Sequence, residues 1–218
     1  MNSHFATAQL YGILDLGYCP LENAESMMDR MLEGGVEIVQ LRAKELSAEA
    51  LGAIVKPLVT LCKQVEVPII INDHAVLARK LGATGVHVGQ GDIPVAIARA
   101  WGTGPYGPSA IVGKSTHSLE QAQVAAQEGA DYIGFGPLFA TPTKPDYAPI
   151  GIDEIAAVHE LVDLPIFCIG GIKLENLEPI LNAGAKRVVI VSGILQAPDV
   201  IAYCREVRAM LAELAPLS

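Results

Sequence analysis

Short apolar runs recur along the chain with helix-like segments between them, and this alternation restricts the possible folds more than any other feature. The runs are LYGILDL (10–16), VEIVQLR (36–42), PIIIND (68–73), GVHVGQ (85–90), AIVGKS (110–115), YIGFGPLF (132–139), PIFCIGG (165–171) and RVVIVSG (187–193). Apolar residues at helical spacing fill the segments 24–35, 48–64, 119–130, 174–185 and 199–214. Strands that alternate with helices favour parallel pairing through right-handed crossovers.

The pattern therefore predicts an α/β protein, a single-domain (β/α)₈ TIM barrel over residues 1–218. Hydrophobic residues make up 51% of the chain and aromatic residues 5%, a composition typical of buried parallel strands with Ala-rich helices. A doubly wound open sheet is the alternative, although six or fewer strands would be more usual there. Left-handed C-terminal caps are expected where helical segments close on glycine, at Gly34, Gly82, Gly129 and Gly184.

The charge of the chain bears on its partners and its compartment. A formal net charge of −9 argues against a nucleic-acid partner, since that affinity comes largely from Lys and Arg. Small phosphorylated ligands remain compatible, because helix N-termini, a few cations or a metal create local positive sites. The chain shows no signal peptide and no apolar run long enough for a membrane span, so a cytoplasmic protein without a membrane partner is expected.

The cysteines carry no sign of a metal or disulfide framework. Cys19, Cys62, Cys168 and Cys204 are widely spaced and form no CxxC pair. Core or surface thiols in a reducing compartment are the favoured interpretation.

Unusual polar residues cluster where the predicted strands end, and this is the end of a barrel that carries chemistry. Gln40, Arg42 and Lys44 share one face of their strand by period-two alternation. A neutral amide beside two cations suits a ligand with a heterocycle and a phosphate chain. The alternative is a structural ion pair or a solvated strand end.

Two carboxylates follow the next two strands. The third strand ends in Asn72 and Asp73, and the fourth is followed by Gln90 and Asp92. Carboxylates from adjacent strand ends can share one Mg²⁺, which typically keeps waters and substrate phosphate oxygens as its other ligands. The same residues could instead serve as helix N-caps.

Hydroxyls, an ammonium group and glycines continue the rim over the last four strands. Ser115 follows strand five, and Thr141, Thr143 and Lys144 follow strand six. The last two strands end in Gly170 with Gly171 and in Val191 with Ser192 and Gly193. Barrels commonly bind a phosphate on the backbone of these two loops. The rim therefore predicts two anion sites, a metal-assisted one and a backbone one, which suit two phosphorylated substrates.

Other features carry less weight. His87 is expected to be a hydrogen-bonded core residue, while His74 and His117 could be core or site residues, and none is assigned a catalytic role. The Gly/Pro-rich segment 102–110 is expected to be a surface loop at the N-terminal side of the barrel, and the segment 140–151 could be a mobile lid. No GxSxG, Walker A or strand-following GxGxxG motif supports acyl transfer, ATP hydrolysis or hydride transfer.

The motifs QLRAK, IIINDHAVLARKLGATGVHVGQGDIP, GKSTH, GPLFATPTK, CIGGI and IVSGI resemble the thiamine phosphate synthase family in order and spacing, from Leu10 to the last helix. The resemblance implies a Mg²⁺-dependent transferase that joins an aminopyrimidine diphosphate to a thiazole phosphate. Loss of pyrophosphate leaves a pyrimidine methyl cation, which the thiazole nitrogen attacks, and a carboxylated thiazole would also lose CO₂.

The resemblance also implies residue roles. Catalytic groups would be Arg42, Lys44, Ser115 and Lys144, and the pyrimidine diphosphate would bind Gln40, Leu41, Arg42, Ala43, Lys44, Asn72, Ser115 and Lys144. The thiazole phosphate would bind Thr141, Pro142, Thr143, Gly171, Val191 and Ser192, while Asp73 and Asp92 would hold one Mg²⁺ per subunit together with the substrate pyrophosphate.

Two positions depart from the family pattern. The family usually has an acidic residue at position 43, where this chain has Ala43, and a small apolar residue at position 114, where it has Lys114. The competing functions are a thiazole tautomerase of the same barrel superfamily, which lacks the diphosphate and metal apparatus, and a non-catalytic sensor of a phosphorylated ligand. A homo-oligomer is possible.

Overall fold

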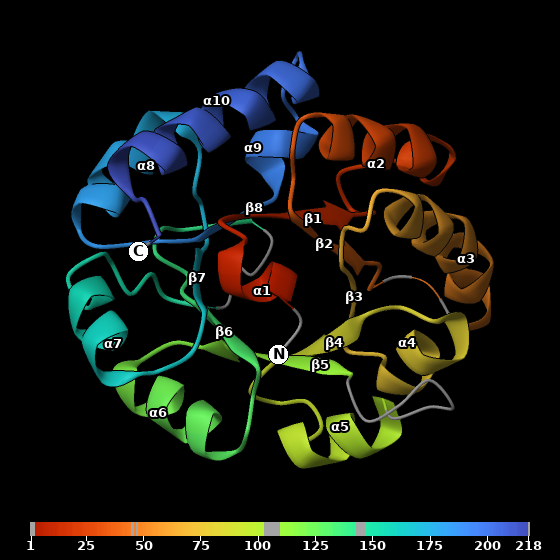
Figure 1. The fold of residues 1–218 in the computed structure, drawn as a ribbon. Helices are drawn as coiled ribbons and strands as arrows, with labels where there is room; N and C mark the ends of the chain where they lie inside the picture. Colours follow the sequence, from red (N-terminus) through yellow and green to blue (C-terminus); the bar gives the residue numbers. More distant parts are fainter. Residues whose placement is uncertain (1–2, 45, 47, 103–109, 143–146, 218) are drawn as a thin grey trace.

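Eight parallel strands close into a barrel in the order of the chain, and β8 pairs with β1 to complete it (Figure 1). The structure is a computed structural model that describes residues 3–44, 46, 48–102, 110–142 and 147–217. The strands are β1 (Leu10–Asp15), β2 (Ile38–Arg42), β3 (Ile69–Asn72), β4 (Gly85–Val88), β5 (Ile111–Thr116), β6 (Tyr132–Phe135), β7 (Ile166–Ile169) and β8 (Val188–Ile190). Seven strands lie within their predicted runs and β5 extends one residue beyond its run, to Thr116, which confirms the barrel.

Helices surround the barrel on the outside (Figure 1). They are α2 (Ala24–Glu33), α3 (Ala48–Gln64), α4 (Ala75–Leu81), α5 (Val95–Gly102), α6 (Leu119–Gln127), α7 (Ile155–Leu161), α8 (Leu174–Asn182), α9 (Ser192–Leu195) and α10 (Val200–Leu214), with the short helices α1 (Ser3–Thr7) and η1 (Leu21–Asn23). An open doubly wound sheet is excluded because Leu10, Tyr11 and Gly12 of β1 pair with Val188, Val189 and Ile190 of β8.

The predicted glycine caps are confirmed at three of four positions. Gly82, Gly129 and Gly184 adopt positive φ at the ends of α4, α6 and α8. The prediction for Gly34 is wrong, because Gly34 keeps a right-handed φ of −71° and Gly35 takes the left-handed conformation with φ 88°. The N–H of Gly34 still donates a helical hydrogen bond to the carbonyl of Arg30. The left-handed residue that ends the helix is therefore the next glycine, Gly35.

The inside of the barrel is filled by a layer of large side chains near its N-terminal end. Tyr11, Ile38, Ile70, Ile111, Tyr132, Phe167 and Val189 belong to one buried cluster there. Helix α1 lies across this end of the barrel (Figure 1), and its Phe5 packs on the Tyr132 ring with 5.1 Å between centroids. The barrel is therefore closed at its N-terminal end.

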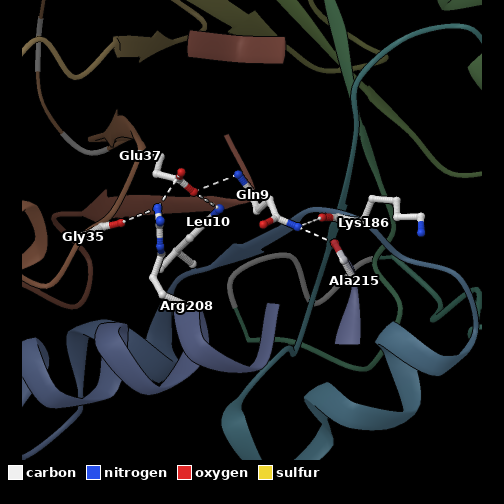
Figure 2. A network of polar contacts seen from close by, with 7 residues as sticks. All are labelled: Gln9, Leu10, Gly35, Glu37, Lys186, Arg208 and Ala215. Atoms are coloured by element: carbon white, nitrogen blue, oxygen red, sulfur yellow. Dashed lines mark hydrogen bonds and ion pairs between the residues drawn. The ribbon is translucent and has the colours of Figure 1, made fainter. Parts of the chain in front are cut away.

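A polar network joins the start of β1, the start of β2 and the C-terminal helix at this closed end (Figure 2). Oε2 of Glu37 accepts hydrogen bonds from the backbone N–H groups of Gln9 (2.8 Å) and Leu10 (2.9 Å). Oε1 pairs with Arg208 of α10 at 2.5 Å. Nε2 of Gln9 in turn donates to the carbonyls of Lys186 and Ala215, so one carboxylate connects both ends of the chain.

We expect Glu37→Ala to lower the free energy of unfolding by about 2–3 kcal/mol, because two backbone N–H groups lose their acceptor. The effect of Arg208→Met should be no more than about 1 kcal/mol, since this ion pair is partly exposed. Arg205→Met on the same helix is the control, because the pair that Arg205 makes with Glu33 at 3.5 Å is exposed. Urea titrations of the variants measure these changes, and a Glu37→Ala variant as stable as Arg205→Met would contradict the account.

The cysteine prediction is confirmed, while two predicted loop segments lie partly outside the described residues. Cys19, Cys62, Cys168 and Cys204 are buried free thiols. In the described part of the chain, no helix combines the length and hydrophobicity that a membrane crossing requires. Residues 103–109 of the predicted surface loop and 143–146 of the predicted lid lie outside the described residues.

Candidate active site

A cavity opens at the carboxyl ends of the strands, opposite the end that α1 closes. Eight of the predicted site residues line it: Gln40, Arg42, Asn72, Ser115, Thr141, Gly171, Val191 and Ser192. Residues that the sequence interpretation did not assign to a site also line it, among them Tyr11, Ile13, His87, Tyr132, Gly134 and Ile169. Polar groups from at least five strands therefore converge on one space, as expected for an active site of a barrel enzyme.

The pleat of β2 decides which of its residues reach this cavity. Gln40 and Arg42 line it, whereas Leu41 and Ala43 are buried in the core cluster that packs against the helices. The side chains of Leu41 and Ala43 thus face away from the cavity, and only their backbone could contact a ligand there. Successive side chains on a strand point to opposite faces, so the smaller residue at position 43 does not alter the cavity wall.

Arg42 is held by a buried carboxylate of the neighbouring strand. Its Nη1 atom forms a hydrogen-bonded ion pair with Oδ2 of Asp15, and the two side chains are only 12% and 3% exposed. Oδ1 of Asp15 accepts the N–H of Gly17 at 2.9 Å, which fixes the carboxylate. A guanidinium held in this way at the cavity wall is oriented before any ligand arrives.

Two carboxylates meet at the rim above β3 and β4, as the sequence predicted. Burial, followed by the adjacent carboxylate of Asp92, raises the pKa of Asp73 to about 6. Asn72 donates to Oδ2 of Asp73 at 2.5 Å, and the charge of Lys44 acts on Asp73 in the opposite direction to Asp92. Asp73 also adopts a left-handed backbone with φ 64°, which is uncommon outside glycine and is found at functional sites.

Lys114 lies beneath the loop that carries Asp92. Its side chain is buried, and Nζ donates to the Gly89 carbonyl at 3.0 Å. The N–H of Gly89 donates to Oδ2 of Asp92 at 2.6 Å, and Gln90 donates to the Ser115 carbonyl at 2.6 Å. The loop after β4 is thus attached to β5, and the unusual charge at position 114 has a structural partner.

The loops after β7 and β8 bring backbone to the other side of the cavity. Gly170 and Gly171 have positive φ angles of 102° and 66°. A Cβ atom on Gly170 would lie 2.4 Å from the Cα atom of Pro137, so this close approach requires glycine. Val191 caps α9, which begins at Ser192, and the first N–H groups of a helix have no partner within that helix. These two loops thus bring backbone to the part of the cavity where the sequence predicts an anion site.

A chain of side-chain hydrogen bonds crosses the floor of the cavity. Nε2 of Gln40 donates to the Tyr11 hydroxyl at 2.8 Å, which is 3.0 Å from the Tyr132 hydroxyl. The Tyr132 hydroxyl lies 3.0 Å from Nδ1 of His87, and Nε2 of His87 lies 2.9 Å from Oγ of Ser115. His87 is the hydrogen-bonded buried residue that the sequence predicted, and it also faces the cavity.

Sequence reasoning missed Tyr11 and Tyr132, which lie within the apolar runs of β1 and β6. What the sequence did offer was a tyrosine hydroxyl at a position of each strand that faces the inside of the barrel. His117 lines the cavity, and its ring lies 4.4 Å from that of Tyr147. His74 is exposed just before α4, and Pro142 is exposed after β6. Thr143 and Lys144, both predicted site residues, lie outside the described residues.

Comparisons with known proteins agree on one family. The family described as thiamine monophosphate synthase matches residues 10–194. A thiamine-phosphate synthase of Chloroflexus aurantiacus is 38% identical over 96% of this chain and 95% of its own length, and one of Thermus thermophilus is 42% identical over 88% and 90%. The structure of a thiamine phosphate pyrophosphorylase from Pyrococcus furiosus superposes with a TM-score of 0.86 at 30% identity, covering 98% of this chain and 99% of that one.

Proposed function

Since this chain belongs to the thiamine monophosphate synthase family, we propose that its cavity joins an aminopyrimidine diphosphate to a thiazole phosphate with release of pyrophosphate. The activity is that of a transferase of thiamine biosynthesis. The observation that carries the assignment of the site is that the Arg42 guanidinium, Asn72 and the glycine loops line one cavity. The paired carboxylates Asp73 and Asp92 adjoin it, because Asn72 donates to Asp73.

The pyrimidine diphosphate is proposed to lie on the side of β2 to β5. Gln40 and Ser115 would contact its ring, Arg42 with Asn72 would contact the diphosphate, and Lys44 with Lys144 would complete the cationic surroundings. Charge develops on pyrophosphate as it leaves, and cations held in advance stabilise that charge without reorganising. The Asp15 carboxylate supports this role of Arg42, because it holds the guanidinium at the cavity wall.

The paired carboxylates Asp73 and Asp92 fit a divalent cation. Burial, and after it the neighbouring carboxylate of Asp92, raises the pKa of Asp73 to about 6, and a cation beside the pair would favour the ionised form of both. Two carboxylates are a sufficient protein contribution for Mg²⁺, which usually takes one or two of them plus water and substrate oxygens. When bound there, Mg²⁺ would neutralise charge on the diphosphate.

The thiazole phosphate is proposed to occupy the opposite side of the cavity. Gly171, Val191 and Ser192 would hold its phosphate through backbone N–H groups and the serine hydroxyl, and Thr141, Pro142 and Thr143 would cover it. The thiazole nitrogen would then face the carbon from which pyrophosphate departs. No covalent intermediate with the protein is needed, because each substrate is held in place by its own phosphate.

The wider setting is also a proposal. One domain spans residues 1–218, acts in the cytoplasm on small phosphorylated substrates and has no nucleic-acid or membrane partner. The net charge of −9 and the four buried free thiols support this setting. Homo-oligomers are compatible with it.

The proposed function is tested by incubating the purified protein with the aminopyrimidine diphosphate, a thiazole phosphate and Mg²⁺, and following pyrophosphate and thiamine phosphate together. We expect both products in equal amounts and expect EDTA to stop their formation, because the leaving group then loses its counter-charge. Product formation that EDTA does not change would remove the metal from the proposal. Bound thiazole phosphate without product would instead indicate the tautomerase or the sensor.

A further inference from the structure

Counting protons shows which atom is the donor in each hydrogen bond of the chain on the cavity floor. We call this order of donors and acceptors the direction of the chain. Nε2 of Gln40 can only donate, so the Tyr11 hydroxyl accepts from it. The single Tyr11 proton must then go to the Tyr132 hydroxyl, because a buried hydroxyl proton without an acceptor is costly. Burial raises the pKa of both tyrosines above the ordinary range, so both hydroxyls keep their protons.

The same count continues through the histidine. Tyr132 accepts from Tyr11, so its own proton goes to Nδ1 of His87. A neutral imidazole that accepts at Nδ1 carries its proton on Nε2, and this N–H donates to Oγ of Ser115. The Ser115 hydroxyl proton is thereby directed to a ligand in the cavity that Ser115 lines.

We propose that Tyr11, Tyr132 and His87 are positioning residues that couple the two ends of this chain, so that the cavity presents an acceptor at Gln40 and a donor at Ser115. At the Gln40 end, Nε2 is turned toward Tyr11, and Oε1 is the amide atom turned away from it. The inference rests on the proposed function for the identity of the ligand, but the direction of the chain does not.

The coupled ends select a ring with one particular hydrogen-bonding pattern. A 4-aminopyrimidine offers an amino group as donor and an unprotonated ring nitrogen as acceptor. Its 4-oxo analogue offers a carbonyl oxygen in place of the amine and carries a proton on the adjacent ring nitrogen, so both sites are reversed. If the donor and acceptor roles were exchanged at one end, they would have to be exchanged in every hydrogen bond of the chain. A site built to hydrogen-bond one pattern of donors and acceptors therefore rejects the opposite pattern strongly.

The direction of the chain is tested without substrate, by ¹⁵N NMR of the histidine side chains in the wild-type protein. We expect the His87 imidazole to be neutral, with its proton on Nε2 and none on Nδ1. Tyr132→Phe should abolish this preference for one tautomer, because Nδ1 loses its donor. Tyr203→Phe is the matched control, since Tyr203 is a hydroxyl acceptor for Leu174 N–H outside the chain, and the His87 tautomer should then stay as in the wild type.

The effect on specificity is measured with the 4-amino and 4-oxo pyrimidine diphosphates. In Tyr132→Phe we expect the KM for the amino substrate to rise about tenfold and the preference for it over the oxo analogue to fall about tenfold. The KM for thiazole phosphate should change less than about twofold, and Tyr203→Phe should keep the wild-type preference.

A proton on Nδ1 of His87 in the wild type, or an unchanged preference in Tyr132→Phe, overturns the inference. A wild-type protein that makes no thiamine phosphate overturns the proposed function instead, and the NMR result still decides the direction of the chain.

Discussion

Asp92→Asn and Asp73→Asn are each expected to lower turnover at saturating substrate about a hundredfold, because each removes half of the charge proposed to hold Mg²⁺ at the leaving group. Initial rates over a series of Mg²⁺ concentrations measure the effect. Higher Mg²⁺ should restore part of the activity, since the remaining carboxylate and the diphosphate still provide ligands.

We expect Asp73→Asn to lower activity without lowering the stability of the fold. The folded protein raises the pKa of Asp73 to about 6, so folding disfavours its carboxylate. This penalty grows as the pH rises from the unfolded pKa of about 4 and is complete above the folded pKa. Asp73→Asn removes that charge, and its melting temperature in EDTA should equal or exceed that of the wild type.

The matched control for both variants is Asp163→Asn. Asp163 is exposed just before β7, at the closed end of the barrel, so neither activity nor Mg²⁺ dependence should change. Near-normal turnover of Asp92→Asn with unaltered Mg²⁺ dependence would refute the metal site. Equal losses in all three variants would mean that the assay reports general destabilisation.

Gly113→Ala is expected to destabilise the fold by about 3 kcal/mol or more, at the upper end of the usual cost of overpacking a core. An added Cβ atom would lie 2.1 Å from Cζ of the Tyr132 ring. The ring has little room to withdraw, since Phe5 and Phe167 lie 5.1 and 5.6 Å from it between centroids. Guanidinium titrations measure the change.

The matched control for this substitution is Gly52→Ala within α3. The nearest atom to a Cβ added there is 3.9 Å away, and alanine is the better helix former by about 1 kcal/mol. We therefore expect Gly52→Ala to be neutral or stabilising. Gly113→Ala as stable as Gly52→Ala would show that the aromatic layer can shift, and it would weaken the view that this layer fixes the hydrogen-bond chain.

The sequence by itself determined the eight strands, the barrel and the end of the barrel that carries the site. These follow from periodicity, because apolar runs alternate with helical segments and because the carboxyl ends of parallel strands must meet at one edge. The same logic predicted that Gln40, Arg42 and Lys44 face inward, which holds for Gln40 and Arg42, whereas Lys44 lies after the end of β2 and is exposed. It also brought Asp73 and Asp92 from neighbouring strand ends together.

Only the tertiary structure decided which groups partner one another across the barrel. Asp15 beside Arg42, Lys114 beneath Gly89, and the chain from Gln40 to Ser115 all join different strands. Their distances depend on barrel closure and on strand register, and neither can be read from local spacing. Tyr11 and Tyr132 resembled ordinary core residues in the sequence, because a hydroxyl acquires its role only when folding places a second polar group within hydrogen-bonding distance.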